Sequence, residues 1–518
     1  MGRMARATGA VRLGESGLRP DEVVAVARHG ARVELTPEAA AAMARSRAAV
    51  EHIAASGAAV YGISTGFGAL ATVRVPAERR SELQHALIRS HAAGVGPPMP
   101  VEVVRAMMLL RARTLARGFS GVRPVVVQSL LAALNAGITP WVPRHGSLGA
   151  SGDLAPLAHV ALTLTGEGDV RAADGAPAPA AEELASAEIH PLTLEAREGL
   201  ALINGTDGML AMLVLACADA ARLAKTADVA AAMSVEALLG TDRVFQPDVI
   251  RIRPHPGQQV SAANLVRLLA GSGIVASHRD SEHLVQDAYS VRCSPQVAGA
   301  ARDALEHADE VAQRELDAIV DNPVVLEDGS VASTGNFHGA PLAVAADALA
   351  IAFAGLASIS ERRTDRLLDP ARSQGLPAFL ALEPGVDSGL MVAQYTAAAL
   401  VAENRRLAAP ASIDSLPTSA MQEDHVSMGW GACLKLRRLL ENTGQVLAIE
   451  AICAARALDL RRPLQPAPGT DAARTRLREV IASWGHDRQL APDLETAADL
   501  VRAGALLDAV EKATAPLE

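Results

Sequence analysis

The stretch "DGMLAMLVLACADAARLAKTADVAAAMSVEALL", Asp207 to Leu239, contains one glycine and no proline. Alanine, leucine and methionine, which favour helix, make up most of it, so it predicts one long helix. Runs of similar character are Val297 to Val320, Leu342 to Arg366 and Met428 to Leu458. Long helices need partners against which to bury a face, and alanine lets their backbones approach closely. The sequence therefore predicts a bundle of long helices.

Strand signals are few in comparison. "NPVVLEDGSVAST", Asn322 to Thr334, places an Asp-Gly turn between two β-branched runs and predicts a hairpin. "GAPAPAAEE" from Gly175 and "PLQPAPGT" from Pro463 are interpreted as surface connections. The expected fold is mainly α, with a smaller mixed N-terminal region. We expect an N-terminal region over 1–205, a long-helix bundle over 206–480 and a C-terminal helical segment over 481–518.

Composition excludes several classes of protein. The 518 residues are half hydrophobic and carry a formal net charge of -10, which argues against a nucleic-acid partner. No uninterrupted apolar run reaches the roughly 20 residues of a membrane span. The four cysteines lie too far apart for a zinc knuckle and show no disulfide framework: Cys217, Cys293, Cys433 and Cys453. We expect a cytoplasmic globular protein with no nucleic acid or membrane partner.

A glycine-rich stretch, "GSLGASGDLAPLAH" from Gly146 to His159, precedes another helical run. A Gly-x-Ser-x-Gly nucleophile elbow fails because Asp153 stands where the second glycine is needed. A dinucleotide-binding loop fails because the glycines recur every third residue. A tight turn with Asp153 capping the following helix is a sufficient structural interpretation. That interpretation leaves the Ala-Ser-Gly core of the stretch unexplained.

The same stretch resembles the signature of the aromatic amino acid ammonia-lyases, in which an Ala-Ser-Gly triplet condenses with itself. The resemblance implies that Ala150, Ser151 and Gly152 form 4-methylidene-imidazol-5-one autocatalytically, with no external cofactor and no metal. It extends from about Glu22 to about Arg462. Six further blocks carry it, in the family's order: "YGISTGFGAL", "LIRSHAAGVG", "LALINGTDGM", "VQDAYSVRC", "GNFHGAP" and "MQEDHVSMG".

These blocks supply the groups that an ammonia elimination needs. Tyr61, on a loop rich in glycine, is the expected base that removes the β-proton. Arg292 is expected to grip the substrate carboxylate, as a guanidinium can do with two parallel hydrogen bonds. Asn204 and Gln286 are expected to donate to the oxygen of the heterocycle without adding charge. The hydroxyl of Tyr289 is expected to have either a catalytic or a structural role.

The substrate is predicted from His91 and Glu423, with Phe337 as a further binding residue. A histidine and a carboxylate suit an imidazole side chain better than the ring of phenylalanine or tyrosine. We therefore expect elimination of ammonia from L-histidine to give trans-urocanate. Glu423 sharing base duty with Tyr61 is an open alternative.

Other interpretations stay open beside this one. A tyrosine or phenylalanine ammonia-lyase, or an aminomutase, would use the same electrophile with a different pocket. A helical assembly protein is disfavoured by the intact polar blocks. A fumarase-like lyase is disfavoured because it would need its own serine-rich signature loop, which the sequence does not show. "SHRDSEHL", Ser277 to Leu284, is interpreted as a solvated loop or helix start in preference to a metal site.

Two positions depart from the family pattern, and the family also implies an assembly. Ala340 stands where many members that act on histidine have Glu, and Asp207 where several have Gln. The resemblance implies a homotetramer whose active sites combine residues of three subunits. Tyr61 would then face Ser151 of a neighbouring subunit.

Overall fold

The computed structural model describes residues 9–14, 16–56, 62, 65, 73–281, 283, 285–483 and 485–518. Tyr61 lies outside the described residues. Within them the chain is mainly helical with four short two-stranded sheets, which confirms the predicted fold class.

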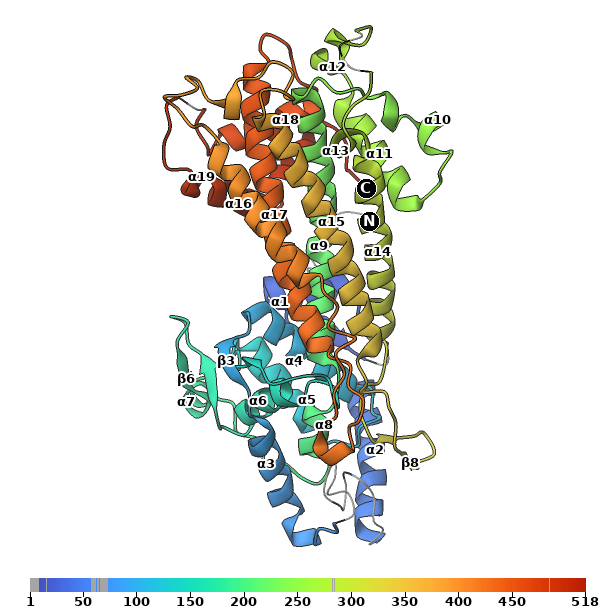
Figure 1. Cartoon of the computed structure of the whole chain (residues 1–518). Coiled ribbons are helices and arrows are strands. Elements are labelled where there is room, and N and C mark those ends of the chain that lie inside the picture. The colour runs from blue at the N-terminus through green and yellow to red at the C-terminus, as the bar shows by residue number, and fades with distance from the viewer. Residues whose placement is uncertain are drawn as a thin grey trace.

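Four long helices run alongside one another through much of the length of the molecule (Figure 1). They are α9 (Asp207–Ala237), α14 (Ser294–Glu315), α15 (Ala340–Leu368) and α17 (Gly429–Leu460). Almost every side chain of α9 is buried, so this helix is the centre of the bundle. Alanines at the contacts, among them Ala230, Ala346 and Ala448, are fully or almost fully buried, as close helix packing requires.

Around this bundle the remaining elements pack at its two ends. Helices of the N-terminal region cover the start of α9: α1 (Pro20–His29), α2 (Pro37–Ser56), α3 (Arg80–His91), α4 (Val101–Ala116), α5 (Pro124–Asn135), α6 (Leu154–Leu164), α7 (Ala180–Ser186) and α8 (Glu198–Ile203). The other end carries α10 (Pro247–Ile250), α11 (Pro256–Leu269), α12 (Gly273–Ser277), α13 (Tyr289–Arg292), α16 (Met391–Leu407), α18 (Pro468–Arg478), α19 (Ala491–Arg502) and α20 (Ala505–Ala513). Short 3-10 turns are η2 (Ala77–Arg79), η3 (Arg243–Phe245), η4 (Ala378–Leu380) and η5 (Ser419–Met421).

The strands form four separate pairs. β1 (Val11–Leu13) and β2 (Val33–Leu35) are parallel, whereas the other pairs are antiparallel: β3 (Val95–Pro98) with β4 (Pro143–His145), β5 (Asp169–Arg171) with β6 (Pro177–Pro179), and β7 (Val324–Val325) with β8 (Val331–Ala332). The last pair confirms the predicted hairpin.

Two segments interpreted as surface connections are more ordered than expected. Pro177–Pro179 forms β6, since proline is tolerated in a strand that pairs on one edge only, and α7 begins at Ala180. The first segment nevertheless lies at the surface, as predicted, with Ala180 its one buried residue. In the second segment Ala467 and Thr470 are buried, and the backbone N–H of Ala467 donates to Glu236 Oε1 at 2.7 Å. The end of the second segment therefore belongs to the packed structure.

One hydrophobic cluster unites most of the chain, including Leu500, Leu506 and Leu517 near the C-terminus. Among the described residues only α15 is long and apolar enough to cross a membrane, and 56% of its most apolar stretch is buried inside the protein. It packs against α9, α14, α16 and α17 as a bundle helix. The three-region division of the chain stays a prediction.

Candidate functional site

The Ala-Ser-Gly turn is held in place by its glycines. Gly149 and Gly152 have φ of 75° and 70°, in the left-handed region that glycine tolerates best. A Cβ on Gly152 would overlap the carbonyl group of Gly205, because the two glycines pair as a parallel β-bridge. The backbone N–H of Asp153 donates to that carbonyl at 2.8 Å. The turn is thus fastened to the segment between α8 and α9.

Ser151 and Asn204 meet across this contact. The Ser151 hydroxyl donates to Asn204 Oδ1 at 2.7 Å, and Asn204 Nδ2 donates to the carbonyl oxygen of Asn322 at 2.7 Å. Asn204 is fully buried. The amide therefore accepts from the serine in this arrangement, while its expected donation to the heterocycle stays a prediction.

Asp153 occupies the N-cap position of α6, but its side chain does not cap that helix. Its Oδ2 instead accepts from the backbone N–H of Met209, in the first turn of α9, at 2.8 Å. Its Oδ1 accepts from the Ser147 hydroxyl at 3.0 Å. The interpretation of Asp153 as the cap of its own helix is therefore wrong, because the N-terminus of α9 lies close enough to take the carboxylate. Burial raises the pKa of Asp153 to about 7.

Two distant blocks close over the same turn. The Ser427 hydroxyl donates to the carbonyl oxygen of Gly149 at 3.2 Å, and the Met428 N–H donates to that of Leu148 at 2.9 Å. Gly339, which belongs to the same block as Phe337, packs against Ser427. The structure thus brings the "GNFHGAP" and "MQEDHVSMG" blocks to the triplet, and Phe337 is half-buried there.

His91 and Glu423 interact electrostatically at this end of the molecule. Burial lowers the pKa of His91, while the charge of Glu423 acts in the opposite direction. Nδ1 of His91 lies 2.9 Å from the carbonyl oxygen of Leu87, which can only accept, so Nδ1 carries a proton and Nε2 of the neutral ring is an acceptor. Glu423 Oε2 accepts from the Thr418 hydroxyl at 2.7 Å, which restricts the carboxylate's orientation.

Gln286, Tyr289 and Arg292 lie at the opposite end of the bundle (Figure 1). Asp287, beside Gln286, accepts from the N–H of Thr241, which follows the C-terminus of α9. Asn204 precedes the N-terminus of α9, whose 31 residues span about 46 Å. One chain therefore does not bring Arg292 and Ser151 together.

Within this second cluster Tyr289 is 72% exposed, and the Arg292 guanidinium lies 4.7 Å from the centre of its ring. This is a cation–π contact between two predicted site residues. Arg292 Nε is buried and has no hydrogen-bond partner in the described part of the chain. The cluster thus presents an aromatic ring and a cation at the surface.

The histidines of "SHRDSEHL" contact the C-terminal end of α9. Nε2 of His278 lies 3.0 Å from the carbonyl oxygen of Gly240, and Nε2 of His283 lies 3.1 Å from that of Leu239. The two rings therefore contact backbone carbonyls of the turn that follows α9. Glu282 lies outside the described residues, and among those described no group of three or more His, Cys, Asp or Glu could hold a metal ion.

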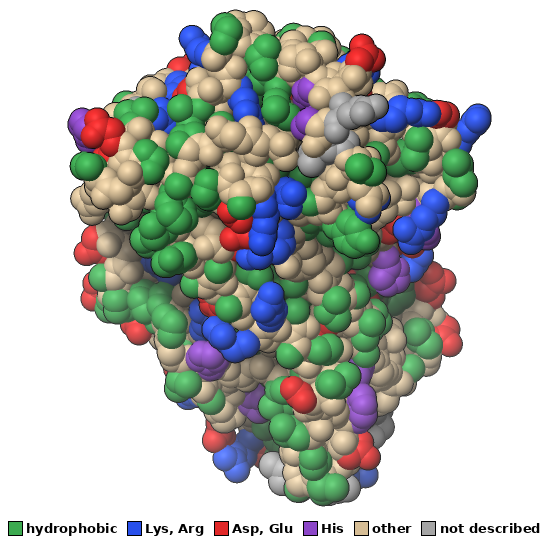
Figure 2. Space-filling model, turned by 45° about the horizontal axis from the view of Figure 1, so that its top comes forward, with side chains coloured by type: hydrophobic (Ala, Val, Ile, Leu, Met, Phe, Trp, Pro, Cys, Tyr) green, Lys and Arg blue, Asp and Glu red, His purple; other side chains and the backbone are tan. Residues whose placement is uncertain are grey.

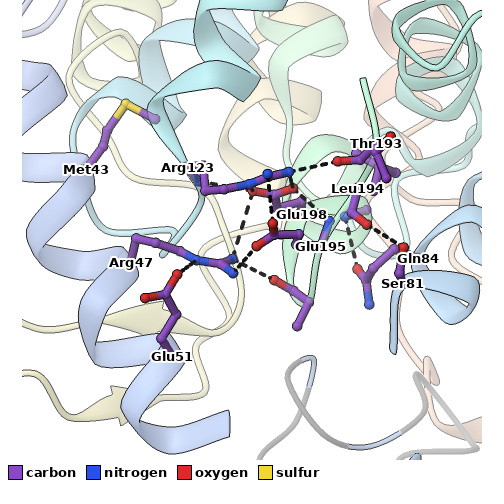
Figure 3. Close-up of polar contacts among 12 residues, drawn as sticks. Met43, Arg47, Glu51, Ser81, Gln84, Arg123, Thr193, Leu194, Glu195 and Glu198 are labelled. Atoms are coloured by element: carbon purple, nitrogen blue, oxygen red, sulfur yellow. Dashed lines mark hydrogen bonds and ion pairs between the residues drawn. The ribbon is translucent and has the colours of Figure 1, made fainter. Parts of the chain in front are cut away.

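A charged network that the sequence did not reveal supports the segment before Asn204. Figure 3 shows Arg47 of α2 and Arg123 pointing toward Glu195 and Glu198, at the start of α8. Arg47 lies 2.6 Å from Glu195, and Arg123 lies 2.7 Å from the fully buried Glu198. In addition, Gln84 Oε1 accepts from the N–H of Gly199 at 2.9 Å. These contacts fix α8, the helix that ends immediately before Asn204.

Comparison with known proteins agrees with this arrangement. The family model "Aromatic amino acid lyase" matches residues 18–479. Histidine ammonia-lyase of Streptomyces coelicolor is 58% identical, over 98% of this chain and 99% of its own length. That of Symbiobacterium thermophilum is 52% identical, over 98% of this chain and all of its own.

Solved structures share the fold over nearly the whole chain. Histidine ammonia-lyase from Trypanosoma cruzi has a TM-score of 0.89 and 42% identity, covering 97% of this chain and 95% of its own. Tyrosine aminomutase from Streptomyces globisporus has a TM-score of 0.94 and 39% identity, covering 98% and 100%. Fold and site together define a carbon–nitrogen lyase. The chain belongs to the aromatic amino acid lyase family.

Proposed function

We propose that this enzyme eliminates ammonia from L-histidine to give trans-urocanate, the first step of histidine degradation. The observation that supports this class of reaction is the hydrogen bond from the Ser151 hydroxyl to the buried Asn204, within a turn held by glycines. The interaction between His91 and Glu423 supports histidine as the substrate. The two curated relatives described above are both histidine ammonia-lyases.

The triplet fits the self-condensation that the family implies. Gly152 N would attack the carbonyl carbon of Ala150, the carbonyl oxygen would leave as water, and Ser151 would lose its hydroxyl and α-hydrogen as a second water. Gly152 adopts a left-handed conformation, Ala150 has a small side chain, and the Ser151 hydroxyl is held by Asn204. Once formed, 4-methylidene-imidazol-5-one supplies an electrophile for the substrate amine, with no imported cofactor.

The chain's own side chains supply the remaining chemistry. Tyr61 removes the β-proton, and Arg292 binds the substrate carboxylate. Gln286, Tyr289 and Asn204 place hydrogen-bonding groups around the reacting atoms. His91, Glu423 and Phe337 bind the imidazole ring, and Nε2 of His91 makes no hydrogen bond within the described part of the chain. Glu423 is the alternative base.

These roles require more than one copy of the chain. Because Arg292 and Ser151 lie at opposite ends of α9, a complete site must take them from different subunits. As far as Gly355 the exposed stripe of α15 is apolar or small, and the next exposed residue is Arg362; the stripe consists of Pro341, Val344, Ala348, Ile351 and Gly355. Val344 and Ile351 are 55% and 52% exposed, and Figure 2 shows further hydrophobic groups at the surface. Such a surface suits self-association as a homotetramer.

The cysteines suit a reducing compartment. All four are free, and Cys217, Cys433 and Cys453 are buried. Thiols that are kept apart in this way fit the cytoplasm.

Product formation tests the proposed function. The purified protein is incubated separately with histidine, tyrosine and phenylalanine, and urocanate, coumarate and cinnamate are followed by absorbance. We expect urocanate from histidine alone at a high rate. Preference for tyrosine, or appearance of a β-amino acid, would assign the chain to the alternative of a tyrosine lyase or aminomutase.

A further inference from the structure

A buried ion pair lies directly behind Asn204. Arg111 of α4 and Asp207, the first residue of α9, have side chains 0% and 1% exposed, with Nη1 and Oδ2 separated by 3.2 Å. The same Arg111 Nη1 donates to the backbone carbonyl oxygen of Asn204 at 2.7 Å. Thr114, one turn further along α4, lies 3.3 Å from Asp207 Oδ1. One guanidinium therefore joins the start of α9 to the residue that holds Ser151.

Gly205 is enclosed between this pair and the triplet. A Cβ on Gly205 would lie 2.5 Å from Arg111 Nη1 and 2.6 Å from Asp207 Oδ2. The carbonyl of Gly205 accepts from the N–H of Asp153, immediately after the triplet. The turn from Asn204 to Thr206 is thus fixed by the ion pair and by the Gly152–Asp153 backbone.

The buried ion pair of Arg111 and Asp207 is poorly suited to stabilising the fold by itself. Taking two charges out of water carries a desolvation cost that their attraction offsets only when the remaining hydrogen bonds are also made. Arg111 Nε and Nη2 are buried and make no hydrogen bond within the described part of the chain. The guanidinium instead fixes the position of the backbone carbonyl of Asn204.

We propose that Arg111, with Asp207 as its counter-ion, is a positioning residue that orients Asn204 toward Ser151 for formation and use of the electrophile. This role rests on the proposed function, because it presupposes that the triplet cyclises. Within the described residues Arg111 makes no hydrogen bond or ion pair with His91, Arg292, Phe337 or Glu423, and it acts through Asn204. A displacement of the order of 1 Å at a reacting group can cost about a hundredfold in rate.

The test compares Arg111→Lys, Arg111→Met and Asp207→Asn with a matched control, Arg302→Lys. Arg302 and Asp228 form another buried pair, 11% and 1% exposed and 2.5 Å apart, between α14 and α9. Three quantities are measured for each protein: the cyclised fraction from intact mass, kcat and KM on histidine, and the thermal midpoint.

For Arg111→Lys we expect a loss of about tenfold to a hundredfold in cyclised fraction or kcat, with KM within about twofold of wild type. Arg111→Met is expected to be worse, and Asp207→Asn milder, because the amide keeps an acceptor for Arg111. Arg302→Lys is expected to lower the thermal midpoint and leave cyclisation and kcat per cyclised site unchanged. If Arg111→Met does not fold, Arg111→Lys and Asp207→Asn carry the comparison.

Three outcomes overturn the inference. Wild-type cyclisation and kcat in both Arg111→Lys and Asp207→Asn would remove the positioning role and leave the proposed function intact. An equal loss in Arg302→Lys would mean that destabilisation alone is responsible. A wild-type chain with the uncyclised mass would overturn the proposed function, and the positioning role with it.

Discussion

The hydroxyl of Ser151 donates a 2.7 Å hydrogen bond to Oδ1 of Asn204, which is itself fixed through its Nδ2 by the carbonyl oxygen of Asn322. Asn204 therefore connects the segments of Ser151 and Asn322, which are distant in the sequence. The backbone bridge between Gly152 and Gly205 holds the same two turns together. The position of Ser151 is set by the fold, so changes in this contact should alter chemistry more than stability.

Gly152 provides the first prediction. Gly152→Ala should prevent cyclisation and destabilise the fold, because a Cβ there overlaps Gly205 and φ is 70°. The left-handed conformation alone costs about 1–2 kcal/mol. Gly175→Ala is the matched control, with φ of 85° and nothing within 4 Å of the added Cβ. Denaturant unfolding and intact mass should show a larger loss for Gly152→Ala; equal losses in both variants would mean that the contact with Gly205 is unimportant.

The raised pKa of Asp153 leads us to expect that the stability of the fold depends on pH. Its pKa is about 7 in the folded state and near 3.8 when unfolded, so between these values the folded chain binds more protons than the unfolded one. Its contribution to stability is therefore full below about pH 4 and is lost as the pH rises toward 7. In Asp153→Asn this dependence should vanish. Measured at equal concentration from pH 4 to 7, the free energy of unfolding of the wild type minus that of Asp153→Asn should fall as pH rises; a difference that does not change with pH would contradict the assignment.

His91 tests substrate choice. His91→Phe should reduce kcat/KM on histidine by much more than any residual activity on phenylalanine, because removing a polar partner penalises the polar substrate selectively. Loss of a hydrogen-bonding group of this kind is expected to cost about tenfold or more. Glu423→Gln, which keeps the shape of its side chain, provides the comparison. An equal fall on both substrates would identify His91 as structural.

If each active site takes Ser151 and Arg292 from different subunits, two inactive variants should complement each other. Ser151→Ala and Arg292→Ala should each be inactive alone, whereas co-expression should give mixed tetramers in which some sites combine an intact Ser151 with an intact Arg292. Activity of the mixture well above either variant is expected. Purified variants mixed after assembly are the control. Absence of any recovery in verified mixed tetramers would show that one chain supplies both residues.

The sequence predicted the long helices and the site blocks because both depend on local patterns. Helical runs free of proline are visible in the stretch from Asp207 to Leu239, and the Ala-Ser-Gly triplet is contiguous. The partner of Asp153 was not predictable, since the first turn of α9 approaches it only in the folded chain.

Other features depend on distances that no local pattern contains. Arg111 is one of three arginines in α4, and nothing in its surroundings in the sequence points to the Asn204 carbonyl. The distance between Arg292 and Ser151 is set by the direction in which α9 runs through the fold. Because no local sequence pattern contains this distance, only the family resemblance predicted that several subunits are needed.

The intact mass of the purified wild-type chain, compared with that of Ser151→Ala, decides whether the Ala-Ser-Gly triplet cyclises. The wild type should weigh two waters less than its translated sequence and show near-ultraviolet absorbance that three tyrosines and three tryptophans do not explain. Ser151→Ala should have its full translated mass, keep the fold, and lose histidine turnover by many powers of ten, because the hydroxyl that must leave is gone. A wild-type chain of full mass that turns over histidine, with Ser151→Ala equally active, would contradict the account.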